Sequence, residues 1–151
     1  MVDIKKKSYI VMLIVALLLF VLDRSIKHLV YIYLEQPIQL LPYVYITHIY
    51  NTGIAFGIGQ SGNMFFFGLS IFIMLFLLYV AYTQPSRYHI GFACILGGAL
   101  GNTIDRIIYG GVLDYVHIWM FPIFNVADVC ITLGAVYILY VSYTKKEVKT
   151  S

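Results

Sequence analysis

The chain has 151 residues, of which 61% are hydrophobic and 11% are charged, and its mean hydropathy is +0.86. A soluble domain holds roughly 45–50% apolar residues, so this composition excludes an ordinary soluble enzyme or binding module. The net charge of +3 comes from basic residues that are divided among several loops, which excludes the basic stripe of a nucleic-acid-binding protein. We therefore expect one integral membrane domain, residues 1–151, without a soluble appendage or a nucleic-acid partner.

Four segments are apolar over the length of about 20 residues that a membrane-spanning helix needs. They are Ser8–Leu34, Met64–Tyr82, Ile90–Ile108 and Ile118–Tyr143. The first follows three lysines, but no small-x-small cleavage site follows its apolar part, so we expect an uncleaved helix. The pattern predicts an all-α polytopic membrane protein with four transmembrane helices.

The distribution of basic residues predicts the orientation of these helices. Lys5–Lys7 precede the first span, Arg87 lies between the second and third, and three more lysines follow the fourth. The connection formed by residues 35–63 contains no Lys or Arg. We expect both termini on the cytoplasmic side and this connection on the outer side.

The outer connection has a β-like composition. Its segment YVYITHIY, Tyr43–Tyr50, is rich in β-branched and aromatic residues, which favour strands. The residues NTG, Asn51–Gly53, form a turn signal before the apolar stretch IAFGI. We therefore predict a small extracytoplasmic β-element between the first and second helices.

Acidic residues in three of the spans share one depth. Counted from the cytoplasmic basic residues at about 1.5 Å per residue, Asp23, Asp105 and Asp128 lie roughly 24–27 Å along their helices. A hydrocarbon core is about 30 Å thick, so this layer lies close to its outer side. Ionisable side chains in a span are costly and indicate a functional site by default.

Structural interpretations account for some of the polar residues. Asp23 and Lys27 are four residues apart on one helix and can neutralise each other. Asp105 has Arg106 beside it, and such a pair at a helix end can pin a loop. We therefore favour a structural role for these residues on their spacing alone.

Two other acids are harder to explain in this way. Asp114 and Asp128 have no basic neighbour within several positions, whereas Asn102 and Asn125 can join helices through hydrogen bonds. Gly110–Gly111 break the third span and turn the chain back. This turn is expected to bring the two unpaired acids together.

Two adjacent carboxylates suit acid–base chemistry on water. Because like charges repel, the pair holds a single proton. The ionised acid can take a proton from an attacking water, while the protonated acid hydrogen-bonds the peptide carbonyl oxygen. A proton-relay pair in a small transporter shows the same spacing. The four histidines form no HxxxH pair, so we expect no metal site.

The chain resembles the bacterial lipoprotein signal peptidases, also called signal peptidase II, in four sequence blocks. These blocks are DRSIK (Asp23–Lys27), NTGIAFG (Asn51–Gly57), GGALGNTIDRIIYGGVLDY (Gly97–Tyr115) and FNVADVCITLG (Phe124–Gly134). The resemblance implies removal of the signal peptide from diacylglyceryl-modified prolipoproteins by cleavage before the lipidated cysteine. It implies no metal or organic cofactor.

By motif, the resemblance assigns the catalytic pair to Asp114 and Asp128. It assigns substrate binding or site architecture to the other polar positions, which are Asp23, Lys27, Asn51, Gly53, Asn102, Asp105, Arg106 and Asn125. We expect a monomer surrounded by lipids of the bacterial cytoplasmic membrane, with its active site near the extracytoplasmic face. The alternative is a non-catalytic relative that binds lipidated signal segments.

The chain departs from the family pattern in three places. Arg24 stands where glutamine is common, Ile54 stands where alanine is common, and only residues 115–127 separate the two acids. The connection between the acids is therefore shorter than is usual in the family. Both acids are retained, so we expect activity with a narrowed substrate range.

Overall fold

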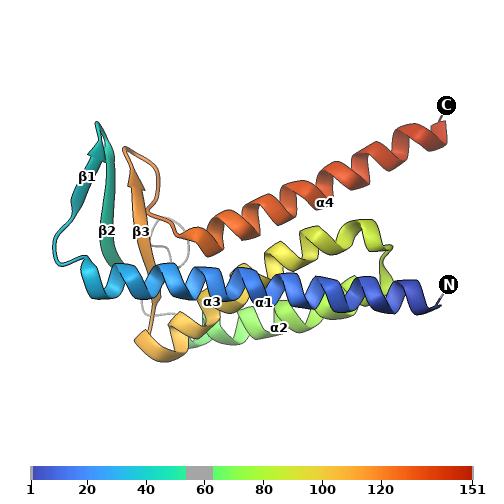
Figure 1. The fold of residues 1–151 in the computed structure, drawn as a ribbon, viewed down its shortest axis with the longest axis horizontal. Helices are drawn as coiled ribbons and strands as arrows, with labels where there is room; N and C mark the ends of the chain where they lie inside the picture. The colour runs from blue at the N-terminus through green and yellow to red at the C-terminus, as the bar shows by residue number, and fades with distance from the viewer. Residues whose placement is uncertain (1, 54–62, 151) are drawn as a thin grey trace.

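The computed structural model describes residues 2–53 and 63–150 (Figure 1). Within these ranges the chain forms α1 (Val2–Tyr33), β1 (Ile38–Leu41), β2 (Val44–Asn51), α2 (Asn63–Thr83), the short 3₁₀ turn η2 (Ser86–Tyr88), α3 (His89–Tyr109), β3 (Val112–Ile118) and α4 (Val126–Thr150). The predicted IAFGI stretch lies outside the described residues. The second and third predicted spans agree closely with α2 and α3, and the first agrees with α1 except that α1 already begins at Val2, ahead of the predicted start at Ser8.

Three of the described helices are long and apolar enough to cross a membrane: α1, α2 and α4. The remaining long helix, α3, carries several polar residues but packs against α1, α2 and α4. Because α3 is surrounded by protein, its polar groups can face other helices instead of lipid. This arrangement explains how a helix with several polar residues can lie between the other three.

The predicted start of the fourth span, at Ile118, was wrong. Ile118 ends β3, Phe124 pairs with Val116 in an isolated bridge, and α4 starts only at Val126. The intervening residues are apolar but form a turn. An apolar run alone does not distinguish such a turn from the first turns of a helix.

A three-stranded antiparallel sheet has β2 at its centre, between β1 and β3. Val44 lies opposite Ile118, and Asn51 lies opposite Val112. The predicted β-element between the first and second helices is therefore confirmed in β1 and β2. The third strand was not predicted, since β3 comes from the connection between α3 and α4.

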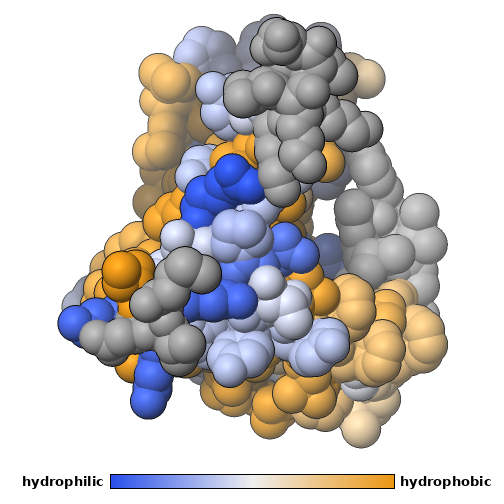
Figure 2. All heavy atoms as spheres, turned by 90° about the vertical axis from the view of Figure 1, so that its right-hand side faces the viewer, coloured by the Kyte–Doolittle hydropathy of each residue, from blue (hydrophilic) through white to orange (hydrophobic). Residues whose placement is uncertain are grey.

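The sheet and the chain termini lie at opposite ends of the molecule. Figure 1 shows α1, α2 and α3 running side by side, with the sheet at one end and both termini at the other. Figure 2 views the end that carries the termini, where hydrophilic residues gather at the centre and hydrophobic ones around the margins. The flanks expose large apolar side chains, among them Leu18, Phe72 and Leu139, as expected for lipid-facing surfaces.

Glycines allow α3 to approach its neighbours closely. A Cβ on Gly97 would lie 2.9 Å from the Leu19 side chain of α1, and a Cβ on Gly98 would overlap the carbonyl oxygen of Ala127 on α4. At its end, Gly110 adopts a left-handed conformation with φ of 72°. This helix end confirms the predicted break and directs the chain into β3.

Candidate active site

The start of α4 is fixed by reciprocal hydrogen bonds between Asn125 and Asp128. The Asn125 Oδ1 atom accepts a bond of 2.9 Å from the Asp128 backbone N–H, and Asp128 Oδ2 accepts one of 3.1 Å from the Asn125 N–H. This is the geometry of a capping box. The same bonds hold the Asp128 carboxylate at the helix N-terminus, where a negative charge is favoured.

Two further amides of this first turn are bonded to other elements. The Val126 N–H donates to the Tyr115 hydroxyl on β3 at 3.2 Å, and the Ala127 N–H donates to Asp23 Oδ1 on α1 at 3.0 Å. The first N–H groups of a helix have no acceptor within the helix itself and need partners from elsewhere. Here, side chains from two other elements hold the turn that carries Asp128.

The second acid, Asp114, lies on β3 and is buried. Its Oδ1 accepts a hydrogen bond of 2.7 Å from Asn125 Nδ2, and its Oδ2 accepts one of 3.1 Å from Asn51 Nδ2. The Asn51 amide is oriented because its Oδ1 accepts the Gly53 N–H at 3.0 Å. The structure thus places Asn51, Gly53 and Asn125 near Asp114.

Asn102 on α3 is hydrogen-bonded to Asp128 and, through Asn125, is linked to Asp114. Its Nδ2 donates to Asp128 Oδ1 at 2.8 Å, and its Oδ1 accepts from Asn125 Nδ2 at 3.1 Å. Asn125 therefore bonds to Asp128 through its capping contacts and to Asp114 through its amide nitrogen. The two acids therefore belong to one hydrogen-bonded network, whereas the sequence predicted only that they come together.

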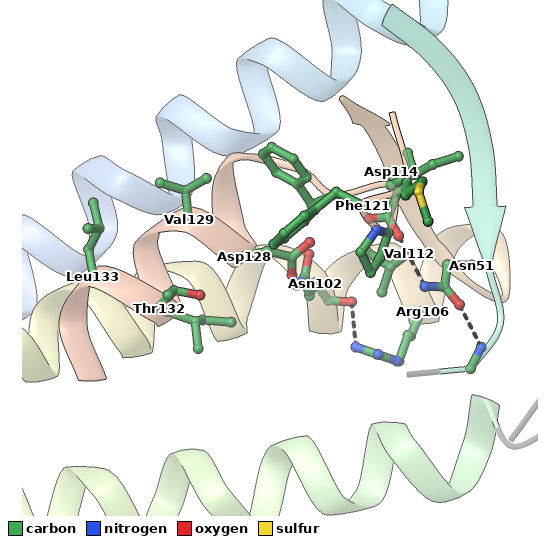
Figure 3. A pocket seen from close by; sticks show the side chains of 16 residues that line it. Asn51, Asn102, Arg106, Val112, Asp114, Phe121, Asp128, Val129, Thr132 and Leu133 are labelled. Atoms are coloured by element: carbon green, nitrogen blue, oxygen red, sulfur yellow. Dashed lines mark hydrogen bonds between the residues drawn. The ribbon is translucent and has the colours of Figure 1, made fainter. Parts of the chain in front are cut away.

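A cavity of about 820 Å³ opens onto this network. Its polar lining residues are Asn51, Asn102, Arg106, Asp114, Asp128 and Thr132, and Gly53 also lines it. Figure 3 shows the two acids at one end of the cavity, with Val129 and Leu133 farther along α4. The cavity thus joins a polar end, where both acids lie, to an apolar wall.

The surroundings of Asp114 favour its protonated form. Burial raises the pKa of Asp114 from its ordinary value of 3.8 to about 6, and the nearby negative charge of Asp128 acts in the same direction. The amide bonds from Asn51 and Asn125 oppose this rise only in part. A perturbed carboxyl group in a cavity is a candidate for acid–base chemistry.

A second polar cluster lies behind the cavity and is centred on Lys27. Lys27 Nζ lies 3.0 Å from Asp23 Oδ2 and 2.7 Å from Asp105 Oδ2, and all three side chains are almost completely buried. The predicted Asp23–Lys27 pair is confirmed. Asp105 pairs with Lys27 and with Arg24, and both of these partners lie on α1.

Residues 15–144 match the family model described as signal peptidase (SPase) II. This chain belongs to the signal peptidase II family. It is 42% identical to the lipoprotein signal peptidase of Mesorhizobium japonicum, over 79% of this chain and 77% of that protein. It is 38% identical to the lipoprotein signal peptidase of Brucella ovis, over 82% of this chain and 83% of that protein.

Two solved structures described as bacterial membrane enzymes have the same fold as this signal peptidase II family member. One aligns with a TM-score of 0.85 at 27% identity, over 92% of this chain and 91% of that one. The other aligns with a TM-score of 0.78 at 28% identity, over 87% and 91%. Together with the apolar helices, these matches establish a multi-pass membrane protein with four long helices.

Sequence reasoning about this signal peptidase II family member missed two structural contacts that lie outside the cavity. Tyr115 is buried, and its hydroxyl holds the start of α4; a tyrosine in a buried strand signals that its hydroxyl needs a partner. Arg24 was noted only as a departure from the family pattern, yet it pairs with Asp105 and stacks over the Tyr109 ring. Its partner lies 81 positions away in the chain, a distance that no local pattern spans.

Proposed function

We propose that this protein is an aspartic endopeptidase of the bacterial cytoplasmic membrane that releases signal peptides from diacylglyceryl-modified prolipoproteins. It cleaves on the N-terminal side of the lipidated cysteine. The observation that carries the proposal is that Asp114 and Asp128 line one cavity and share hydrogen bonds with Asn125. The names of the relatives support the class of substrate.

The two acids have different roles in this proposal. Asp128 is the ionised base, because its carboxylate accepts a backbone N–H and a side-chain amide at a helix N-terminus. Asp114 is the acid, because burial and the charge on Asp128 raise its pKa to about 6, which favours placing the shared proton on this member of the pair. The pair therefore holds one proton between two carboxyl groups, as aspartic peptidases require.

The first step is the attack of water on the scissile carbonyl carbon. The water oxygen forms a bond to this carbon, Asp128 takes one proton from the water, and Asp114 gives its proton to the carbonyl oxygen. In the second step the carbon–nitrogen bond breaks. The departing amine takes the proton from Asp128, and a hydroxyl of the intermediate returns a proton to Asp114, which restores the starting state.

The remaining cavity suits a substrate that is partly lipid. Its walls include Met120 and Phe121 from the turn before α4, and both side chains are exposed by more than two thirds. Apolar walls beside a polar end fit a diacylglyceryl cysteine next to a peptide bond. All of these residues come from one chain, which supports a monomeric enzyme.

The orientation belongs to the same proposal. The basic residues at Lys5–Lys7 and Arg87 support a cytoplasmic location for the end that carries the termini. The sheet lies at the opposite end, and the cavity is lined by residues of β2, β3 and the start of α4. The acids are then near the extracytoplasmic face, where the scissile bond of a membrane-anchored prolipoprotein lies.

The purified protein in detergent, incubated with a diacylglyceryl prolipoprotein, tests this function by the release of the signal peptide. We expect cleavage by the wild type and a loss of kcat of at least about 10³-fold in Asp114→Asn and in Asp128→Asn. Glu35→Gln removes an exposed carboxylate outside the cavity and should not change the rate. Binding without cleavage by the wild type would identify a non-catalytic binder, and full activity in both asparagine variants would refute the pair.

A further inference from the structure

Two buried acids outside the cavity each hold the residue that precedes a proposed catalytic aspartate. Asp23 Oδ1 accepts the N–H of Ala127 at 3.0 Å, and Ala127 immediately precedes Asp128. Asp105 Oδ2 accepts the N–H of Leu113 at 3.2 Å, and Leu113 immediately precedes Asp114. The backbones of both catalytic segments are thus attached to carboxylates of the helix bundle.

One ammonium group joins these two carboxylates. Lys27 Nζ lies 3.0 Å from Asp23 Oδ2 and 2.7 Å from Asp105 Oδ2, and it donates a third bond of 2.9 Å to Asn102 Oδ1. An ammonium group has three donors, and here it faces three oxygens: two carboxylate oxygens in ion pairs and the amide oxygen of Asn102. The side chain is 1% exposed, so these contacts exclude water.

The third contact of Lys27 orients an amide in the site. Asn102 Oδ1 accepts from both Lys27 and Asn125, which leaves the amide nitrogen to donate to Asp128. If the Asn102 amide turned over, its nitrogen would face two donors and its oxygen would face a carboxylate. Lys27 therefore acts against this rotation.

We propose that Lys27 is a positioning residue that sets the separation of the two catalytic segments by bridging Asp23 and Asp105, and that fixes the Asn102 amide. This inference rests on the proposed function. Lys27 does not line the cavity, so it acts on catalysis without contacting the substrate. The simpler interpretation is that Lys27 only neutralises buried carboxylates.

Variants separate positioning from neutralisation. Lys27→Met removes all three contacts of the ammonium group. Asp23→Asn/Lys27→Met removes one charge of each sign, so the cluster stays neutral, and the asparagine oxygen can still accept the Ala127 N–H. Arg24→Met is the matched control, because it removes the other cation paired with Asp105 but no contact to Asp23 or Asn102.

The kinetic constants for prolipoprotein cleavage in detergent provide the test. Misplacement of reacting groups by about 1 Å can cost on the order of 10²-fold in rate. We expect kcat to fall by about 10–100-fold in both Lys27 variants, with KM within about twofold of wild type. Arg24→Met should keep kcat within about threefold.

A charge-balanced variant with wild-type kcat would overturn the proposal, because neutralisation would then be the whole role of Lys27. A rise in KM at unchanged kcat would also overturn it. If Arg24→Met folds and neither Lys27 variant does, the lysine is required for the fold itself and the proposal fails. Failure of the proposed function has a different signature, since the wild type would then not cleave or Asp114→Asn would remain active.

Discussion

Asn125 illustrates how much one side chain contributes to this site. Its oxygen accepts the Asp128 N–H at the start of α4, while its nitrogen donates to Asp114 and to Asn102. An aspartate or serine can cap a helix equally well, but neither can donate an amide hydrogen to a carboxylate. The residue type is thus determined by the site and not by the cap.

Replacement of Asn125 by aspartate separates these two functions. The Asn125→Asp variant retains the capping oxygen but places a third carboxylate against Asp114, in place of a donor. We expect the thermal midpoint in detergent to change by only a few degrees, because the cap persists. We expect kcat to fall by at least about 100-fold. Cleavage kinetics and thermal unfolding of the same preparation measure both effects, and a wild-type kcat would contradict the role of the amide.

The raised pKa of Asp114 predicts a dependence of stability on pH. The pKa rises from 3.8 to about 6 on folding, so the folded state binds this proton more tightly than the unfolded state. The associated stability is present below about pH 4 and is lost as the pH rises through about 6. The whole difference is at most roughly 3 kcal/mol.

The Asp114→Asn variant should lack this component, because asparagine does not titrate. We expect its thermal midpoint to fall less than that of the wild type between pH 4 and pH 7. Thermal unfolding of both proteins in detergent across this range provides the comparison. If the thermal midpoints of the two proteins changed by the same amount between pH 4 and pH 7, the pKa of Asp114 would be the same in the folded and unfolded states.

At the scale of elements, the sequence predicted what depends on local composition. Hydropathy located α1, α2 and α3, and Gly110–Gly111 marked the turn that carries Asp114 toward α4. The third strand was missed because the pairing of β3 with β2 joins residues far apart in the chain. The start of α4 was missed because Asn125, and not the apolar run, determines where the helix begins.

The candidate site was predictable to a similar extent. The sequence indicated the two acids because no basic residue accompanies them, but it did not reveal their hydrogen bonds. Contacts such as those of Arg24 with Asp105 and of Tyr115 with Val126 depend on helix and strand packing. Such packing is established only when the whole fold forms.

The close packing of α3 against α4 predicts the effect of one added methyl group. A Cβ on Gly98 would overlap the Ala127 carbonyl oxygen and lie 2.9 Å from the Ile131 side chain. We expect Gly98→Ala to cost about 1–3 kcal/mol of stability and to lower kcat by about 10-fold or more, since Ala127 adjoins Asp128. Thermal unfolding and cleavage kinetics measure the two losses.

Gly68 on α2 is a matched control for this substitution. A Cβ at Gly68 meets no atom within 4 Å, and alanine favours a helix more than glycine does. The Gly68→Ala variant should therefore be at least as stable as the wild type and equally active. If Gly98→Ala were as stable and as active as Gly68→Ala, α3 and α4 could move apart without loss of stability or activity, and the prediction would be wrong.

At the scale of the whole molecule, the sheet at one end of the helices also exposes large apolar side chains. Trp119, Leu40 and Leu41 are each exposed by more than half. The backbone N–H of Trp119 donates a hydrogen bond of 2.8 Å to the backbone carbonyl of Tyr43. The centroids of the two side-chain rings lie 6.3 Å apart. Aromatic residues with exposed faces are typical of the boundary between membrane and water.

Trp119 is the only tryptophan in the chain, so its fluorescence reports on this edge of the sheet. In bilayers we expect lipids brominated near the headgroup to quench this fluorescence more strongly than lipids brominated near the chain end. Aqueous iodide should quench it weakly. Strong quenching by iodide, without quenching by brominated lipids, would place the sheet away from the membrane surface.

The Lys27 cluster also has a consequence for biosynthesis. Asp23 and Lys27 belong to α1, the first helix to leave the ribosome, whereas Asp105 and Ala127 belong to helices made later. When α1 enters the membrane, the lysine and the aspartate four positions before it have each other as partners. The contacts of Lys27 with Asp105 and Asn102 form once α3 has been added. The bond between Asp23 and Ala127 forms only after α4 arrives. Asp128 lies in the first turn of α4. If it is the catalytic base, we expect no proteolysis before α4 has been made.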